Sequence, residues 1–168
     1  RYSAYLKPSE GAMDPIRAKV LIIKRGDKKL LFMSADLVAM TKQFQKELAI
    51  RLKPLGFNPS DIIVSGTHTH NGPGNIANNA FWEIVAVDRF IPEIYYGIVS
   101  QIVELVHRVD NELEPGFLFA YDFQAQGLQR NRREDHEERV YDPTSNVLLA
   151  KNWKGQWLGG MVNLAIHG

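Results

Sequence analysis

Short apolar runs rich in β-branched residues alternate with two segments of helical periodicity, and this alternation most constrains the fold. Buried strands are short and apolar, whereas a helix that packs on a sheet repeats its apolar residues every three or four positions. The runs at residues 18–25 and 30–35 flank a Gly-Asp turn, which predicts a β-hairpin. Another run, at residues 61–65, follows the first helical segment. The pattern predicts an α/β fold with a mixed β-sheet and flanking helices in layers, since hairpins exclude a purely parallel sheet.

Two segments carry the helical repeat. The first has apolar residues at Phe44, Leu48, Leu52 and Leu55, and Pro54 with the following glycine marks its end. The second begins at Pro92, a residue tolerated in the first turn of a helix. Its expected apolar stripe consists of Ile94, Ile98, Ile102, Leu105 and Val109.

The last third of the chain predicts further strands. Apolar runs at residues 117–121, 146–150 and 157–166 have strand character, and the last two are expected to pair. No repeat or linker divides the chain, and its length favours one domain. Because the chain starts without Met and stops straight after an apolar run, we expect residues 1–168 to be an incomplete piece of a longer protein.

Composition and motifs exclude several classes of protein. The chain has no cysteine, which excludes disulfide scaffolds, thiolate metal sites and cysteine nucleophiles. Its 20 basic and 19 acidic residues give a net charge of +1, which argues against nucleic acid as a partner, because phosphate binding needs a basic surface. The sequence lacks the apolar stretch of about 18 residues that a membrane span needs, and it begins without a signal peptide. Motifs for nucleotide binding, a serine nucleophile elbow and a zinc-protease helix are also absent.

The most informative motif is the sequence THTH at residues 67–70, directly after the predicted strand at 61–65. At the end of a strand, residues two apart point to the same face, so the imidazoles of His68 and His70 are expected to converge. Ligands of α/β sheets usually bind at the carboxyl ends of strands, and imidazole is a common ligand of zinc. The alternative is that both are loop histidines bonded to nearby backbone.

His167 ends an apolar strand, where an ionisable group is costly unless it is bonded or bound. It is a candidate third histidine for a metal site, with a carbonyl-bonded core histidine as the alternative. Catalytic zinc takes about three protein ligands plus water, so further ligands are required. Asp36, after the strand at 30–35, could contribute one, but a cap on the following segment is the favoured interpretation of this residue.

Other polar residues have a competing structural interpretation. Arg132 lies in an Asn-Arg-Arg sequence and could bind a carboxylate or an oxyanion, or could belong to a charged surface loop. The Gly-Pro-Gly sequence at residues 72–74 could present backbone N–H groups to an anion, or simply turn the chain. His107 and His136 are expected on the surface.

The chain resembles the neutral/alkaline ceramidase family. The sequence SGTHTHNGPG at residues 65–74 resembles the family signature THTHSGPG, with Asn71 in the place of the usual serine. The other landmarks occur in the family's order, from about residue 10 to the end of the chain. They are DPIRA at 14–18, LFMSADLV at 31–38, NR at 131–132 and AIH at 165–167.

The resemblance implies a zinc-dependent amidase that cleaves the N-acyl bond of ceramide, with residues 1–168 as the amino-terminal portion of its catalytic domain. It implies that His68 and His167 are zinc ligands, that His70 binds substrate or handles a proton beside the metal, and that Arg132 lines the pocket. A glutamate and a tyrosine further along a longer chain would complete the zinc site, so the fragment alone is expected to be inactive. The implied partners are a lipid substrate such as ceramide, the chain beyond Gly168 and a membrane surface. The implied location is secreted, periplasmic or at the cell surface.

Two other functions stay open at this point. The same metal site could hydrolyse another amide or an ester, because Asn71 and Arg133 depart from the family pattern. The chain could also be a non-catalytic binding module on the same scaffold.

Overall fold

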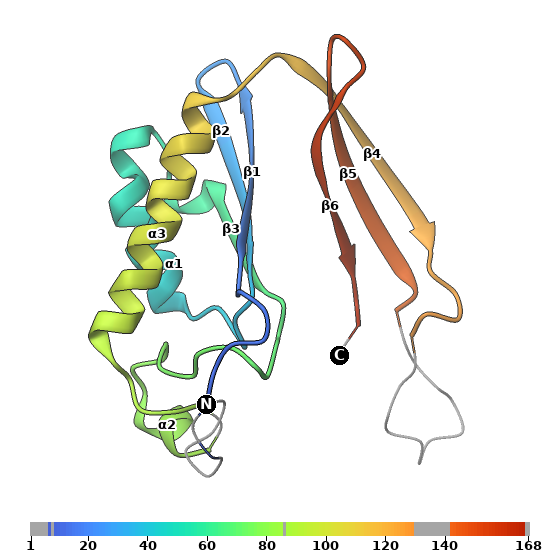
Figure 1. Ribbon diagram of the computed structural model, residues 1–168. Helices are drawn as coiled ribbons and strands as arrows, with labels where there is room; N and C mark the ends of the chain where they lie inside the picture. Colours follow the sequence, from blue (N-terminus) through green and yellow to red (C-terminus); the bar gives the residue numbers. More distant parts are fainter. Residues whose placement is uncertain (1–6, 8, 86, 130–141, 167–168) are drawn as a thin grey trace. The chain divides into compact units, whose positions relative to one another are not determined.

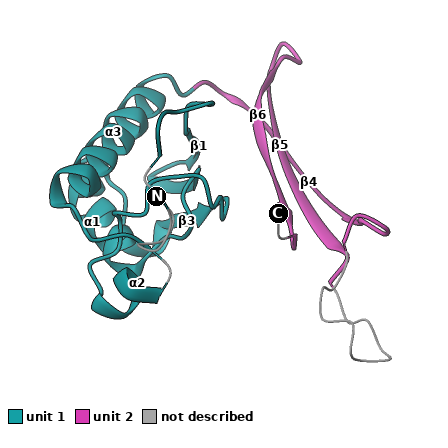
Figure 2. Ribbon diagram, turned by 60° about the horizontal axis from the view of Figure 1, so that its bottom comes forward, with its two compact units in different colours: residues 1–113 teal, residues 114–168 magenta. Residues whose placement is uncertain are grey.

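The computed structural model describes residues 7, 9–85, 87–129 and 142–166 (Figure 1). The chain divides into two compact units, Arg1–Leu113 and Glu114–Gly168 (Figure 2). The first unit contains helices and a three-stranded sheet, and the second contains another three-stranded sheet. Each unit is described by itself.

The sheet of the first unit is mixed, as predicted. Strands β1 (Ala18–Arg25) and β2 (Lys28–Ala35) form an antiparallel hairpin, and β3 (Ile62–Gly66) pairs parallel to β2. The hairpin turn needs a left-handed backbone, which Gly26 supplies at φ 58°. The predicted hairpin is therefore confirmed, with β2 starting two residues before the expected run. The parallel partnership places the carboxyl ends of β2 and β3 at the same edge of the sheet.

Helices α1 and α3 cover one face of this sheet (Figure 1). Thr41 caps α1, because its hydroxyl accepts the backbone N–H of Phe44 at 3.1 Å. Pro92 occupies the first turn of α3, as predicted. The helical elements of this unit are α1 (Lys42–Leu52), η1 (Lys53–Leu55), η2 (Pro59–Asp61), α2 (Ala80–Val85) and α3 (Pro92–Asn111).

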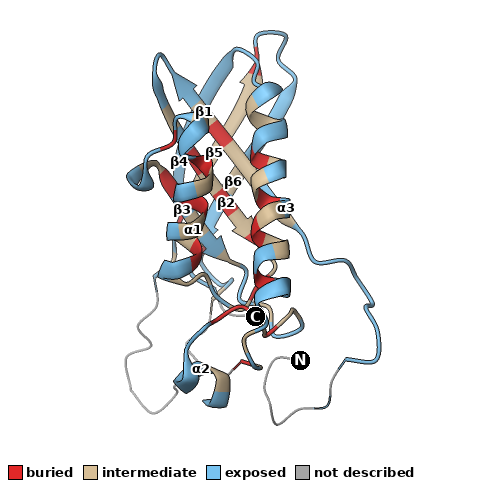
Figure 3. Ribbon diagram, turned by 90° about the vertical axis from the view of Figure 1, so that its left-hand side faces the viewer, coloured by how far each residue is buried: buried red, intermediate tan, exposed pale blue. Residues whose placement is uncertain are grey.

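The core lies between the sheet and these two helices. The sequence predicts the buried side of α1 correctly at Phe44, Leu48 and Leu52. The predicted stripe of α3 is confirmed at Ile102, which is buried, and at Ile98 and Val109, which pack partly buried against the core, whereas Ile94 is exposed. Figure 3, with buried residues in red, shows buried positions recurring along α3 between exposed turns. These residues are Tyr95, Val99, Ile102 and Val106.

The first buried residue of α3 is an aromatic phenol, Tyr95, which the predicted stripe leaves out. The Tyr95 ring lies edge-on to Phe44 at 5.5 Å and also contacts the rings of Phe90 and Tyr96. Burial raises the pKa of Tyr95 to about 12, because the phenolate would lose its hydration.

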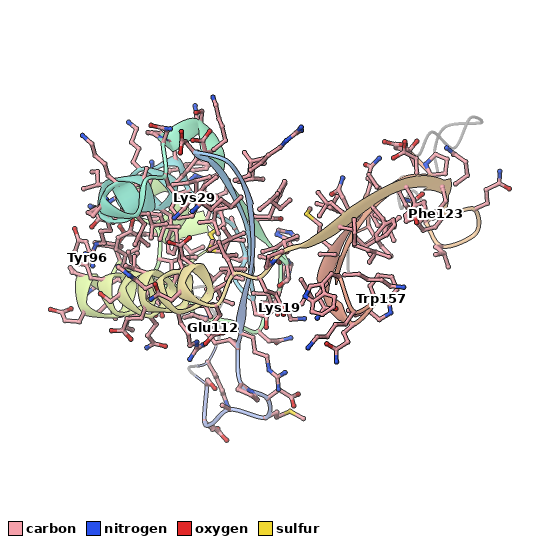
Figure 4. The ribbon with its side chains drawn as sticks, turned by 90° about the horizontal axis from the view of Figure 1, so that it is seen from above. Lys19, Lys29, Tyr96, Glu112, Phe123 and Trp157 are labelled. Carbon is pink, nitrogen blue, oxygen red and sulfur yellow. The ribbon has the colours of Figure 1, made fainter. Side chains whose placement is uncertain are left out.

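The second unit is an antiparallel meander of β4 (Gly116–Gln124), β5 (Thr144–Asn152) and β6 (Trp157–Leu164). The predicted strands and the pairing of the last two are confirmed. Every residue of β4 is exposed, although the strand is largely apolar and aromatic. Figure 4 shows Phe123 and Trp157 projecting from this sheet.

Together the two sheets and their helices confirm the predicted α/β class. Within the part of the chain that the structure describes, none of the helices combines the length and apolar character that crossing a bilayer requires.

Candidate metal centre

The candidate site is built on the loop that follows β3. Because β2 and β3 are parallel neighbours, the segments that follow them leave the sheet at the same edge and contact one another. The contact begins with main-chain hydrogen bonds: Thr67 N–H donates to the Ala35 carbonyl at 2.9 Å, and His68 N–H donates to the Leu37 carbonyl at 3.1 Å. These bonds hold residues 67–74, called the histidine loop below, against the segment that follows β2.

His68 has an unusual backbone and a fixed ring. It is the only non-glycine residue in the described ranges with a positive φ, at 60°, a conformation that costs a side-chain-bearing residue free energy. Its Nδ1 lies 2.6 Å from the Val38 carbonyl oxygen. A carbonyl can only accept, so Nδ1 carries a proton and Nε2 is the ring nitrogen that faces His70. Metal-bound histidines commonly have this arrangement, because the outer hydrogen bond fixes the tautomer and orientation of the ring.

The rings of His68 and His70 converge. Their Nε2 atoms lie 3.4 Å apart, and their ring planes cross at 82° with centroids 5.0 Å apart. Both side chains are exposed. Two nitrogen ligands of a tetrahedral zinc ion, each about 2.0–2.1 Å from the metal, are separated by roughly 3.3 Å. The spacing therefore lets His70 reach an ion on His68 directly or through a bound water.

Two glycines allow the loop to approach the segment after β2 closely. A Cβ added to Gly66 would lie 2.8 Å from the Leu37 carbonyl oxygen, a distance that requires backbone displacement. A Cβ on Gly72 would lie 3.0 Å from the Asp36 carbonyl oxygen. Gly72 thus lets the loop lie against the segment after β2, and the anion-binding interpretation of the Gly-Pro-Gly sequence stays a prediction.

Other candidate residues take different places. The Asp36 carboxylate accepts the backbone N–H of Arg17 at 2.9 Å, so it anchors the start of β1 rather than capping the segment that follows. His107 is exposed on α3, as expected. His167, Arg132 and His136 lie outside the described residues, so their expected roles stay predictions.

The described residues supply only part of the ligands that a metal ion needs. Across the described ranges, no cluster of three histidine, aspartate or glutamate side chains is arranged to hold an ion. Two imidazoles, one with its tautomer fixed, are suitable zinc ligands but leave at least one ligand to come from elsewhere. That the remaining ligands come from further along a longer chain stays a prediction.

Sequence reasoning missed the groups that orient His68. They are the main-chain carbonyls of Leu37 and Val38, which no side-chain pattern reveals. The parallel pairing of β2 with β3 is the signal that could have located them, because it brings the two loops together.

The fold and the histidine loop together define an α/β protein. Its pair of histidines lies at the edge of a mixed sheet where the carboxyl ends of β2 and β3 meet. The chain belongs to the neutral/alkaline non-lysosomal ceramidase family, whose N-terminal region it matches over residues 2–137. It is similar to the neutral ceramidase of Pseudomonas aeruginosa, with 25% identity over 164 residues covering 90% of this chain and 24% of that protein. It is also similar to the neutral ceramidase of Drosophila pseudoobscura pseudoobscura, with 24% identity over 90% of this chain and 23% of that protein.

Solved structures share the fold. The crystal structure of the Pseudomonas aeruginosa neutral ceramidase superposes with a TM-score of 0.78 at 23% identity, covering 89% of this chain and 26% of that one. A structure described as ceramidase complexed with C2 gives a TM-score of 0.76 at 22% identity, covering 89% of this chain and 25% of that one. The chain thus spans about a quarter of the length of the relatives it matches.

Proposed function

We propose that this chain is the amino-terminal portion of the catalytic domain of a zinc-dependent amidase. The substrate is ceramide or a ceramide-like lipid, and hydrolysis of its N-acyl bond gives a sphingoid base and a fatty acid. Family membership supports the choice of substrate and reaction. The single observation that carries the metal role is the convergence of His68 and His70 with the His68 tautomer fixed by a carbonyl.

In this proposal His68 and His167 hold the zinc ion, and a glutamate and a tyrosine from the rest of the catalytic domain complete the site. Bound zinc supplies Lewis acidity toward the amide carbonyl and activates water for attack. His70 takes up the proton that the attacking water loses and returns it to the leaving amine, whose bond to the acyl carbon breaks. Arg132 contacts the oxygen that becomes negative in the tetrahedral transition state.

The proposal also covers the setting of the reaction. A ceramide-like substrate resides in a membrane, so the enzyme makes peripheral contact with a lipid surface. Family membership supports a location outside the cell, in the periplasm or at the cell surface. Residues 1–168 alone supply too few zinc ligands for turnover. Robust hydrolysis by this fragment would contradict that expectation.

The test compares variants of the full-length protein by zinc content and by hydrolysis of N-acylsphingosine. His68→Ala should lose both stoichiometric zinc and activity, whereas His107→Ala, on the exposed side of α3, should keep both. His70→Ala should lose activity by about 10²–10⁴-fold, the range for a removed proton-transfer group, while retaining zinc. Equal zinc content and activity in His68→Ala and His107→Ala would refute the proposal.

A second substrate class is favoured by one observation. Asn71 stands where the family usually has serine, and it follows His70 directly in the exposed loop. The same site could therefore act on another amide or an ester. Rates on a panel of N-acylsphingosines, N-acyl amino acids, peptides and esters separate the two, because a ceramide-specific enzyme hydrolyses only the first group efficiently.

A further inference from the structure

A half-open pocket of about 280 Å³, called the cavity below, lies in the first unit between α3 and the open end of the β1–β2 hairpin, where Ala18 pairs with Ala35. Its wall is formed by residues 16–18 at the start of β1, residues 35–37 at the end of β2, and one side of α3. Leu37 and Ile102 form a buried apolar part of the lining. The cavity is distinct from the histidine pair, which is not among its lining residues.

The polar lining of this cavity favours an anion. Arg17 and Arg108 contribute two guanidinium groups, and Asp36 contributes one carboxylate, so the lining carries a net charge of +1. The carboxylate already accepts the Arg17 backbone N–H at 2.9 Å. Both arginines are exposed, and in the ranges that the structure describes neither guanidinium forms a hydrogen bond or an ion pair. Both are therefore available to bind a carboxylate or a phosphate, which guanidinium groups bind through paired hydrogen bonds.

The volume sets the size of the ligand part that this half-open pocket can enclose. At about 30 Å³ for each water molecule in the liquid, the cavity has room for roughly nine waters, which corresponds to a ligand of about ten non-hydrogen atoms. Such a ligand combines an anionic head with a short apolar body. We propose that this cavity binds an anionic amphiphile with a short aliphatic tail, its head held by Arg17 and Arg108 and its tail against Leu37, Ile102 and Leu105.

The cavity wall is also the support of the histidine loop. The Leu37 carbonyl accepts the His68 N–H, and the Asp36 carbonyl lies against Gly72. An occupant in contact with residues 35–37 therefore touches the segment that positions His68. The binding proposal goes beyond the proposed hydrolysis and can be tested without any measurement of activity.

The experiment uses octanoate, which has ten non-hydrogen atoms, and isothermal titration calorimetry of the full-length protein. Arg17→Gln and Arg108→Gln should each weaken binding at least tenfold, and Leu105→Trp should abolish it by filling the cavity. The matched control is Arg25→Gln, at the exposed hairpin end of β1, which should bind as the wild type does. Octyl phosphate in place of octanoate distinguishes phosphate from carboxylate as the preferred head, and octanol measures the contribution of the tail alone.

A photoreactive diazirine analogue of octanoate locates the bound molecule. Cross-linked peptides should contain residues 16–18, 35–37 or 98–108. The proposal is overturned if wild-type protein fails to bind either anion, if octanol binds as tightly as both, or if Arg17→Gln and Arg108→Gln bind like Arg25→Gln. Cross-links confined to the exposed sheet of the second unit would also overturn it, because they would report adsorption to apolar strands.

Discussion

Replacing Asp110 with asparagine tests the ion pair with Lys29, which is better buried than the pair of Glu47 with Arg51. The Lys29 Nζ atom lies 2.7 Å from both carboxylate oxygens of Asp110 and donates to the Leu55 carbonyl at 2.9 Å. It also lies 5.4 Å from the centre of the Phe57 ring. The side chains of Lys29 and Asp110 are only 14% and 10% exposed, and Lys29 is labelled in Figure 4. One ammonium thus joins β2, η1 and the last turn of α3.

The cost of Asp110→Asn follows from this geometry. Removing one partner of a buried ion pair costs about 3–5 kcal/mol, because the remaining charge is left uncompensated. Here Lys29 keeps the Leu55 carbonyl, and an amide oxygen can replace one carboxylate contact, so we expect about 2–3 kcal/mol. That is a large fraction of the ~5–15 kcal/mol by which a typical domain is stable.

Hydrogen exchange of the full-length protein, measured by mass spectrometry, provides the assay. Exchange in β2 and the end of α3 should accelerate by roughly 30- to 150-fold, the equivalent of 2–3 kcal/mol. The matched control is Glu47→Gln, which removes a 2.7 Å pair with Arg51 whose side chains are more exposed, at 26% and 33%, and should cost less than about 1 kcal/mol. Replacing both partners, as Lys29→Met with Asp110→Leu, should restore part of the loss. Equal exchange in Asp110→Asn and Glu47→Gln would refute the reasoning.

Three further predictions concern the core, the loop and a helix end. Tyr95→Phe should stabilise the fold by about 1 kcal/mol, because within the described residues the buried hydroxyl has no hydrogen-bond partner. The folded pKa of about 12 lies above the unfolded value of about 10, so wild-type stability should fall as pH rises from 10 through 12. Denaturation midpoints that change in parallel in both proteins would contradict this. Gly66→Ala should lower zinc content by displacing Leu37 from beneath His68, whereas Gly97→Ala, in open space on α3, should leave zinc content unchanged and stabilise the helix by about 0.5–1 kcal/mol. Thr41→Ala should speed exchange at the start of α1 by about fivefold, the equivalent of about 1 kcal/mol for a lost cap, and unchanged exchange there would contradict the capping role.

Local signals predicted most of the secondary structure. The Gly-Asp turn, the repeat of Phe44 with Leu48 and Leu52, and Pro92 each act through nearby residues, and each prediction was confirmed. The partner of β3 was not predicted, because a parallel pairing depends on a crossover connection rather than on neighbouring residues. The division into two sheets likewise depends on contacts between distant segments.

In the candidate site, too, local sequence predicted one part, and contacts between distant segments determine the rest. The convergence of His68 and His70 was predicted, but the expected reason was incomplete. Strand β3 ends at Gly66, so both histidines lie in the loop, and His68 has a left-handed backbone rather than an extended one. The rings meet because the segment after β2 holds His68, a contact that strand periodicity does not encode.

The bond from the His68 ring to the Val38 carbonyl has a consequence for genetics and for protein engineering. Every amino acid carries a carbonyl, so substituting position 38 leaves the acceptor in place, and an alanine scan would overlook it. Tolerance of replacements at that position is therefore compatible with strict dependence on its backbone. Inserting or deleting one residue between 36 and 40 is the change that would misalign the imidazole, which makes the length of this segment, rather than its composition, the quantity to preserve in redesign.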